Sequence, residues 1–381
     1  TVLKADHSTY NGQDGNDTLY IDAKIKLNSS GYPVVVWQEV DHNTNGEEDA
    51  SFGVYYKQFN GSSWDATRTV DSDSIEEDGL TTGTVAFDIY PGTDVPTVFS
   101  CNSSEGSGIY QYRTTDQFAS NTTAVQVTGD SSCSSVDVVI DSDPDIYLAA
   151  MDNRDGGDEV DVYLNPDSTS AAQGSWSSDA NGVITNANVI NEGYVRIASA
   201  GSGVVYVAAL NESETANQDS IIFAERNSGT WEPQVSVATG LDNTEFDLAV
   251  DAGNNDNAYI AFADGAGHLQ IAYGKSSFTS ETVNDFGYDD DSAKSNVVLE
   301  YNSYGSLGQM EVVAIVTGDL NENLAGELDH YSVTSLPSSG GGGGGAVPEF
   351  STYVYVATIM ALFGMMYKKN PEAFGFVGVQ K

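Results

Sequence analysis

One pattern of strands recurs six times along the chain and constrains the fold more than any other feature. Each copy has a short apolar strand, a turn, and a second strand rich in Val, Ala and Tyr, and the copies start about 50 to 60 residues apart. The second strands are expected at residues 33–37, 95–99, 146–150, 204–208, 258–262 and 311–315. Such continuous apolar runs, rich in β-branched and aromatic residues, indicate sheets buried on both faces.

A third strand and an aromatic turn complete the repeat. Strands such as 54–57 and 221–224 follow the second strands, and a turn rich in Gly and Ser then leads into an aromatic residue and a further strand. The aromatic residues are Trp64, Trp176, Trp231 and Phe278. Four strands at this period are typical of a propeller blade. The sequence therefore predicts an all-β fold, a six-bladed β-propeller with four-stranded blades over residues 1–336.

The sixth repeat ends near Leu336 without an outer strand, whereas residues 1–6 have no place in the first repeat. An open ring would leave unpaired strand edges. We therefore expect residues 1–6 to complete the sixth blade, and the alternative is a frayed terminus.

The Gly-Ser/Thr-Trp turns resemble those of sialidase-like and other Asp-box-like propellers. The full Asp-box string upstream of Thr-Trp is absent, so the resemblance implies the fold alone. No HExxH, GxSxG, phosphate-binding or dinucleotide motif occurs in the sequence. The five arginines fall at different strand positions, which argues against the arginine cluster that a sialidase needs for a carboxylate substrate.

An uncharged C-terminal segment predicts a membrane anchor. Six glycines at 340–345 lie in a linker that we place at 337–346. Residues 350–367 carry no charge and as a helix would span about 27 Å, close to the thickness of a hydrocarbon core. Lys368 and Lys369 follow, and such a basic stop marks the cytoplasmic side. We expect a single transmembrane helix within 347–369, a tail at 370–381, and an extracellular propeller at the cell surface; the alternative is a helix buried in a soluble core.

The sequence Val-Pro-Glu-Phe-Ser-Thr at 347–352, the apolar span and the lysine pair together resemble the PEF-CTERM sorting signal of archaeal surface proteins. This resemblance implies export, and often processing by an archaeosortase with transfer to a membrane anchor. Residues 370–381 continue beyond the basic pair, where such signals usually stop, so retention as a membrane span is the alternative to processing.

The loop at 41–49 predicts a calcium site, because side-chain oxygens alternate along it and Gly46 permits the sharp turn. It resembles the calcium loops of integrin-type propellers. Its candidate ligands are Asp41, Asn43, Asn45, Glu47 and Asp49. Weaker candidates are Asp319, Asn321, Asn323 and Glu327 in the sixth repeat and Asp152, Asp155 and Asp158 in the third. An ordinary solvated acidic loop is the alternative at each place.

Two kinds of covalent modification are expected of an exported chain. The only cysteines, Cys101 and Cys133, permit one disulfide, and the alternative is two free buried thiols. Six Asn-x-Ser/Thr sequons lie in the segment expected outside the cell. They are at Asn16, Asn28, Asn60, Asn102, Asn121 and Asn211.

Three functional hypotheses remain open from sequence. The preferred one is a non-enzymatic, surface-anchored propeller that recognises a glycan, a protein or a neighbouring cell, or that packs into an envelope layer. The second is a surface glycoside hydrolase or lyase with an acidic pair near the propeller axis. The third is a subunit that assembles with copies of itself into a sheet or filament.

The acidic composition excludes one class of partner and predicts a salt response. Fifty-six acidic and 14 basic residues give a net charge of −42 at pH 7, which repels nucleic acid and anionic lipid surfaces. A hydrophobic content of 40% still rules out a disordered chain. The acidic residues therefore indicate a solvated surface suited to high salt, as in a halophilic source.

We expect the melting temperature to rise between dilute and molar salt, because counterions screen the repulsion among the acidic side chains. Thermal unfolding followed by circular dichroism at increasing NaCl concentration measures this. Equal melting temperatures in dilute and molar salt would contradict the halophilic interpretation.

Overall fold

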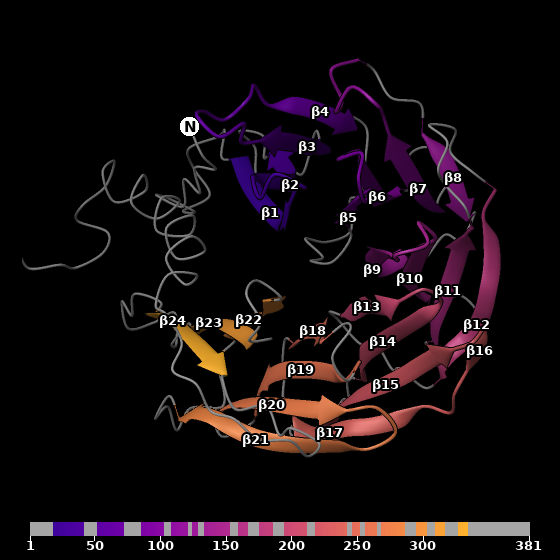
Figure 1. Cartoon of the computed structure of the whole chain (residues 1–381), viewed down its shortest axis with the longest axis vertical. Helices are drawn as coiled ribbons and strands as arrows, with labels where there is room; N and C mark the ends of the chain where they lie inside the picture. Colours follow the sequence, from indigo (N-terminus) through magenta and orange to yellow (C-terminus); the bar gives the residue numbers. More distant parts are fainter. Residues whose placement is uncertain are drawn as a thin grey trace, which may run out of the picture.

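The structure is a computed structural model of the 381-residue chain. It describes residues 18–41, 52–71, 85–102, 108–120, 124–128, 133–152, 159–166, 175–185, 194–211, 218–241, 246–251, 256–264, 268–285, 295–302, 309–316 and 327–333. The regular structure in these ranges is entirely β-strand, in six antiparallel sheets arranged around one axis (Figure 1). The predicted all-β class and sixfold repeat are confirmed.

Sheets one to three each have four strands, which follow one another from the axis outward. Sheet one is β1 (Thr18–Leu27), β2 (Pro33–Asp41), β3 (Phe52–Gln58) and β4 (Arg68–Asp71). Sheet two is β5 (Val85–Ile89), β6 (Pro96–Asn102), β7 (Gly108–Arg113) and β8 (Val125–Thr128). Sheet three is β9 (Cys133–Ile140), β10 (Ile146–Asp152), β11 (Glu159–Asn165) and β12 (Ser177–Thr185).

Sheets four to six vary this plan. Sheet four is β13 (Val195–Gly201), β14 (Val204–Asn211), β15 (Asp219–Asn227), β16 (Thr230–Trp231) and β17 (Val235–Leu241). Sheet five is β18 (Phe246–Val250), β19 (Ala258–Ala263), β20 (His268–Gly274) and β21 (Phe278–Asp285). Sheet six is β22 (Ser295–Asn302), β23 (Gln309–Val316) and β24 (Glu327–Val333).

The prediction of four strands in every blade needs one correction, and for sheet six it stays untested because residues 1–6 lie outside the described residues. In sheet four, β16 and β17 both pair with β15, so the outer strand is in two pieces. Pro233 lies between the pieces, and proline cannot donate to a strand ladder. In sheet six the described residues form three strands.

Several predicted segments lie outside the described residues. These are residues 1–6, the linker at 337–346, the anchor at 347–369 and the tail at 370–381. In the described part of the chain, no helix is long and apolar enough to span a membrane.

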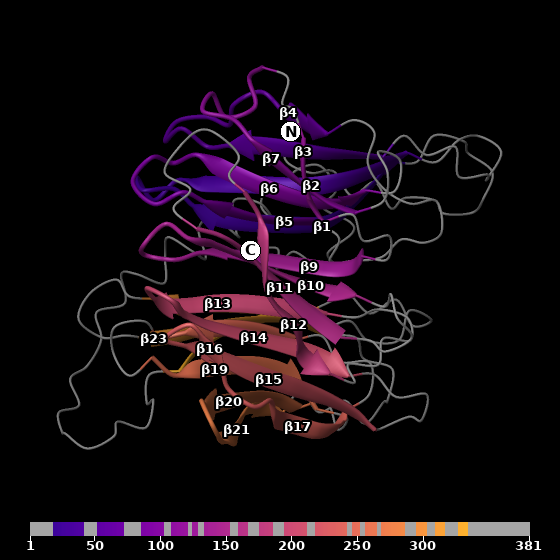
Figure 2. The same ribbon diagram turned by 90° about the vertical axis from the view of Figure 1, so that its right-hand side faces the viewer.

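Sheets two, three and four each bury both faces against two neighbouring sheets, as the apolar runs predicted. On β10, Tyr147, Ala149 and Met151 pack towards sheet four, whereas Ile146, Leu148 and Ala150 pack towards sheet two. A side view shows how the sheets succeed one another around the axis (Figure 2). Fully burying one such large side chain contributes about 1.5–3 kcal/mol, so the sheet-to-sheet seams hold most of the apolar stabilisation.

At three seams an aromatic residue, which lies before the outer strand or begins it, packs against the preceding sheet. The ring centroids are 5.6 Å apart for Trp176 and Phe99, and 4.9 Å apart for Phe278 and Phe223. Phe118 plays the same part against Tyr56 at 5.4 Å. Phe118 was not predicted from the sequence, because its turn lacks the Gly-Ser signature.

Aspartates of the innermost strands cap the edges of their neighbours. The Ile140 N–H donates to Asp88 Oδ2 at 2.9 Å, the Ile197 N–H to Asp137 Oδ2 at 3.0 Å, and the Leu299 N–H to Asp247 Oδ2 at 2.8 Å. Each bond crosses to the innermost strand of the next sheet. These carboxylates satisfy N–H groups at strand edges, which would otherwise be unpaired.

One buried hydroxyl gives a direct test of the seams. Thr97 Oγ1 in β6 is buried and has no hydrogen-bond partner in the described structure. A buried unsatisfied group costs about 1–3 kcal/mol, so Thr97→Val should raise the free energy of unfolding by about 1 kcal/mol. Urea denaturation in molar salt measures the change. Thr69→Val, on the exposed face of β4, is the control and should change stability by less than about 0.5 kcal/mol. A destabilised Thr97→Val protein would contradict the described packing around β6.

Candidate functional site

The predicted calcium sites lie at or beyond strand ends. Asp41 and Asp152 end β2 and β10, and Glu327 begins β24. The other predicted ligands, Asn43, Asn45, Glu47, Asp49, Asp155, Asp158, Asp319, Asn321 and Asn323, lie outside the described residues. Among the described residues no three His, Cys, Asp or Glu side chains cluster as metal ligands. Calcium binding therefore stays a prediction.

The predicted glycosylation sites that the structure describes differ in how exposed their asparagines are. Asn28 is 8% exposed, and its Oδ1 accepts from the backbone N–H groups of Ser30 and Tyr32 at 3.0 and 2.9 Å. Its amide thus holds the β1–β2 turn and is poorly placed to carry a sugar. Asn60 is exposed at the tip of a turn, and Asn211 is half-buried at the end of β14. Asn16, Asn121 and the side chain of Asn102 lie outside the described structure.

Cys101 in β6 is buried and disulfide-bonded. The other cysteine of the chain is Cys133, whose backbone begins β9 in the neighbouring sheet. The described cysteines include no free thiol.

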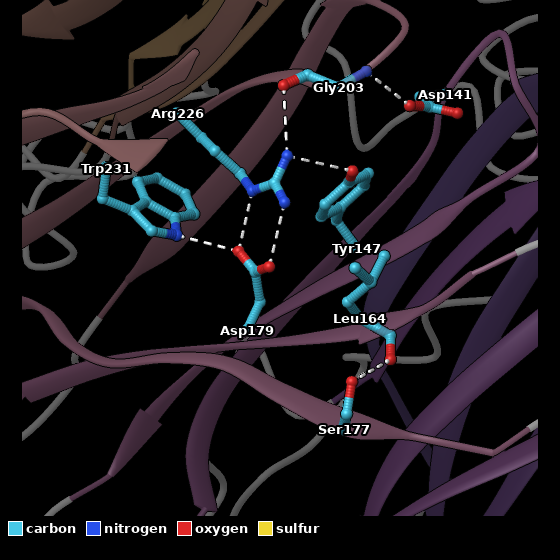
Figure 3. Close-up of polar contacts among 8 residues, drawn as sticks. All are labelled: Asp141, Tyr147, Leu164, Ser177, Asp179, Gly203, Arg226 and Trp231. Atoms are coloured by element: carbon cyan, nitrogen blue, oxygen red, sulfur yellow. Dashed lines mark hydrogen bonds and ion pairs between the residues drawn. The ribbon is translucent and has the colours of Figure 1, made fainter. Parts of the chain in front are cut away.

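A charged cluster at the seam between sheets three and four is the most developed polar site in the described structure. Arg226 in β15 donates from Nε to Asp179 Oδ2 at 2.8 Å and from Nη2 to Asp179 Oδ1 at 3.0 Å. Trp231 Nε1 donates to Asp179 Oδ2 at 2.9 Å. Figure 3 shows the carboxylate of Asp179 between the arginine fork and the indole. Asp179 therefore accepts three hydrogen bonds from sheet four.

The second edge of the guanidinium is held by sheet three and by a backbone carbonyl. Arg226 Nη1 lies 3.3 Å from the hydroxyl of Tyr147 and 3.2 Å from the carbonyl oxygen of Gly203 (Figure 3). Its charge also lies 5.2 Å from the centroid of the Tyr147 ring. Burial raises the pKa of Tyr147 to about 12, although the nearby Arg226 opposes this. The phenol is therefore neutral at pH 7 and can accept from the guanidinium.

These contacts leave part of each charged group available. A guanidinium has five N–H donors, and four of those of Arg226 are used by Asp179, Tyr147 and Gly203. The remaining donor is on Nη2, next to Asp179 Oδ1. The side chains of Arg226 and Asp179 are 10% and 12% exposed, so each keeps a small part of its surface in contact with solvent.

The arrangement is not repeated at the neighbouring seams. In sheets three and five, the third-strand residues equivalent to Arg226 in the strand pairing are Asn165 of β11 and Gly274 of β20. At the seam between sheets two and three, Trp176 Nε1 donates to the Gln111 amide at 3.1 Å instead of to a carboxylate. Among the seams that the structure describes with side chains, the Arg–Asp–Trp cluster therefore occurs once.

Only part of this site was visible in the sequence. Trp231 was predicted as a repeat element, whereas Arg226 looked like one of five arginines out of register. Asp179 carried no signal, because it is one of 56 acidic residues and lies 47 positions from Arg226. The five-position spacing between Arg226 and Trp231 across the β15–β16 turn is a local clue, since that turn pairs the two residues.

The described residues also contain a His–Asp pair. His268 Nδ1 lies 3.0 Å from Asp264 Oδ2, and Asp264 Oδ1 accepts from the backbone N–H of His268. Gln270 donates to the same carboxylate at 2.8 Å. These bonds close the turn between β19 and β20, so the pair has a structural role in this hairpin.

Comparison with known proteins identifies the fold but not a family. No family model and no curated protein matches the chain. A triple arginine-to-alanine mutant of AofleA from Arthrobotrys oligospora has a TM-score of 0.51 at 11% identity, over 87% of this chain and 94% of that one. At this identity the likeness shows the fold alone.

Two other solved structures match the chain with lower TM-scores. The lectin of Aleuria aurantia, described as a six-bladed β-propeller with a novel fucose recognition mode, has a TM-score of 0.44 at 13% identity, over 85% of this chain and 98% of that one. The Hadza microbial sialidase Hz136 has a TM-score of 0.47 at 14% identity, over 77% of this chain. The match spans 63% of the sialidase.

The ion pair predicts a large cost for removing one partner. Asp179→Ala should lower the free energy of unfolding by about 2–4 kcal/mol, because the charge of Arg226 would stay largely buried without its carboxylate. The control is Asp65→Ala, whose carboxylate lies 3.9 Å from Arg68 in a more exposed pair and should cost less than about 1 kcal/mol. Chemical denaturation of both variants measures the difference, and equal losses would show that the Arg226 pair is not a buried contact.

Proposed function

We propose that this chain is a non-enzymatic recognition protein that binds carbohydrate at the seam between sheets three and four. The observation that carries the proposal is the paired Arg226 and Asp179 with the indole of Trp231 against them. Fold alone does not decide between binding and hydrolysis, and the proposal therefore rests on the chemistry of the cluster.

A sugar hydroxyl is both a donor and an acceptor, and the cluster offers one of each side by side. The remaining N–H on Arg226 Nη2 can donate to a hydroxyl oxygen, while Asp179 Oδ1 accepts its proton. Hydrogen bonds to charged groups are about twice as strong as neutral ones. The half-buried Trp231 adds an aromatic surface for the apolar face of a sugar ring.

The pair is also preorganised. Both charged side chains are already fixed by contacts to Tyr147, Gly203 and Trp231, so a ligand does not bear the entropic cost of ordering two long side chains. This favours binding over turnover, because the second carboxylate at the cluster, Asp141, is held by the backbone N–H of Gly203 at 2.9 Å (Figure 3).

The carboxylates near the axis also favour a binding protein over a hydrolase. Asp88, Asp137 and Asp247 each accept a backbone N–H from the next sheet. Arg196 Nε lies 3.3 Å from Asp247, and burial raises the pKa of Asp247 although Arg196 opposes it. These aspartates serve the seams between sheets, and the hydrolase hypothesis needs an acidic pair that is not committed in this way.

The proposal includes the cellular setting expected from sequence. A glycine tether followed by an uncharged span and two lysines supports display on the outer surface of a membrane, with the propeller directed away from it. In that setting the protein recognises glycans of a neighbouring cell or of the surrounding envelope. Calcium in the 41–49 loop and glycosylation at Asn60 remain part of the proposal.

A glycan array followed by isothermal titration calorimetry tests the binding site. Arg226→Lys should weaken the affinity for the best array ligand about ten-fold or more, because lysine cannot hold the bidentate geometry. The control is Arg68→Lys, since Arg68 contacts backbone carbonyls at the seam between sheets one and two, at 2.6 and 3.0 Å. Equal affinities of the two variants would refute the site, and release of free sugar from the ligand would refute the non-enzymatic function.

A further inference from the structure

An acidic turn of sheet three reaches the Arg226–Asp179 pair through sheet four. Asp141 begins the turn between β9 and β10 and is 2% exposed. Its Oδ2 accepts from the backbone N–H of Gly203 at 2.9 Å, in the turn between β13 and β14. The carbonyl oxygen of Gly203 in turn accepts from Arg226 (Figure 3). A single residue therefore separates the carboxylate of Asp141 from the guanidinium.

Two further aspartates belong to the same β9–β10 turn. The backbone N–H groups of Asp143 and Asp145 donate to Asp141 Oδ1 at 2.9 and 3.0 Å, and these bonds close the turn around that carboxylate. Asp143 Oδ2 accepts from the hydroxyl of Ser202, the residue before Gly203. The turn thus brings three aspartates to the β13–β14 turn that Arg226 contacts.

The charges of these aspartates act on the binding groups. Burial raises the pKa of Tyr147, Arg226 opposes this, and three carboxylates add to it, those of Asp141, Asp145 and Asp179. Burial opposes the charge of Arg226, yet Asp179 and Asp145 raise its pKa above the ordinary value. With Asp143 of the same turn, four carboxylates accompany one guanidinium, so four negative charges and one positive leave a net charge of −3.

The hydrogen-bonding groups left at the pair suit a hydroxyl and not a carboxylate. Arg226 already holds Asp179 through Nε and Nη2, at 2.8 and 3.0 Å, so its fork cannot take a ligand carboxylate in the same bidentate way. The donor that remains on Nη2 lies beside Asp179 Oδ1. A ligand carboxylate has acceptors only and would place its oxygens against those of Asp179, where like charges repel. A hydroxyl both donates and accepts, so it satisfies both groups.

We propose that the site selects uncharged sugars and rejects acidic ones, with Asp179 and the aspartates of the β9–β10 turn as the specificity-determining residues. The proposal rests on the carbohydrate site between sheets three and four and names the class of sugar that this site accepts. Arginine is well suited to binding carboxylates, so selection against acidic sugars at an arginine site is a distinctive consequence of this arrangement.

Matched glycans test this selectivity on the full chain. An array carries terminal glucose, galactose and mannose, each beside its uronic acid, which differs only at C6, and isothermal titration calorimetry measures the affinities. At the lowest NaCl concentration at which circular dichroism shows the native fold, the neutral sugar should bind about ten-fold or more tightly than its uronic acid. The ratio should fall towards one in molar salt, because the Debye length shortens to about 3 Å.

A charge-removing variant tests the role of the turn. Asp145→Asn keeps the backbone hydrogen bonds of the turn and should strengthen binding of the uronic acid about three-fold. Asp141 is unsuitable for this substitution, because an amide nitrogen cannot accept from the N–H of Gly203. The matched control is Asp256→Asn in the corresponding β18–β19 turn of sheet five, which should leave the affinity ratio unchanged.

The outcomes separate this proposal from the proposed function. A uronic acid that binds as tightly as its neutral parent, with both affinities lost in Arg226→Lys, would overturn the selectivity and leave the carbohydrate site in place. Equal effects of Asp145→Asn and Asp256→Asn would overturn the role of the β9–β10 turn. If no glycan binds in a way that depends on Arg226, the proposed function itself is refuted, and the selectivity with it.

Discussion

The burial of both faces of a sheet, seen in sheets two, three and four, is the constraint on which the rest of the described structure depends. Each face can be covered only by the next sheet around the axis, so apolar side chains point in both directions from the middle strands. The arrangement leaves strand edges at the axis, where Asp88, Asp137 and Asp247 satisfy backbone N–H groups of neighbouring sheets. Burial and edge capping thus act at the same seams.

The candidate binding site lies at one seam, between sheets three and four, where charged groups are added to the usual aromatic contact. The aromatic residue that elsewhere packs on a neighbouring ring is Trp231, which here donates to Asp179. Arg226 completes the cluster and bridges sheets three and four through Asp179 and Tyr147. Such a buried ion pair contributes little net stability compared with an apolar seam, although breaking it is costly. Its presence at a single described seam is easier to explain by recognition than by stability.

The sequence predicted the elements that depend on local pattern. The second strands begin within two residues of their predicted starts because their apolar runs are uninterrupted, although several extend further, as β14 (Val204–Asn211) does beyond the predicted 204–208. Trp176 and Phe278 were predicted because short turns precede them. The seam contacts were not predictable, since Asp179 and Arg226 come together only through the packing of two sheets. Asn28 shows the reverse, because its sequon is visible in the sequence while the turn that occupies its amide is not.

The proposed binding site lies at the seam between sheets three and four, where Arg226 and Asp179 join the two sheets. The most direct measurement is an experimental structure of the protein with its best-bound oligosaccharide. The account predicts a sugar hydroxyl within hydrogen-bond distance of both Arg226 Nη2 and Asp179 Oδ1, with the ring against Trp231. A sugar bound elsewhere, with this cluster closed and unchanged, would contradict it.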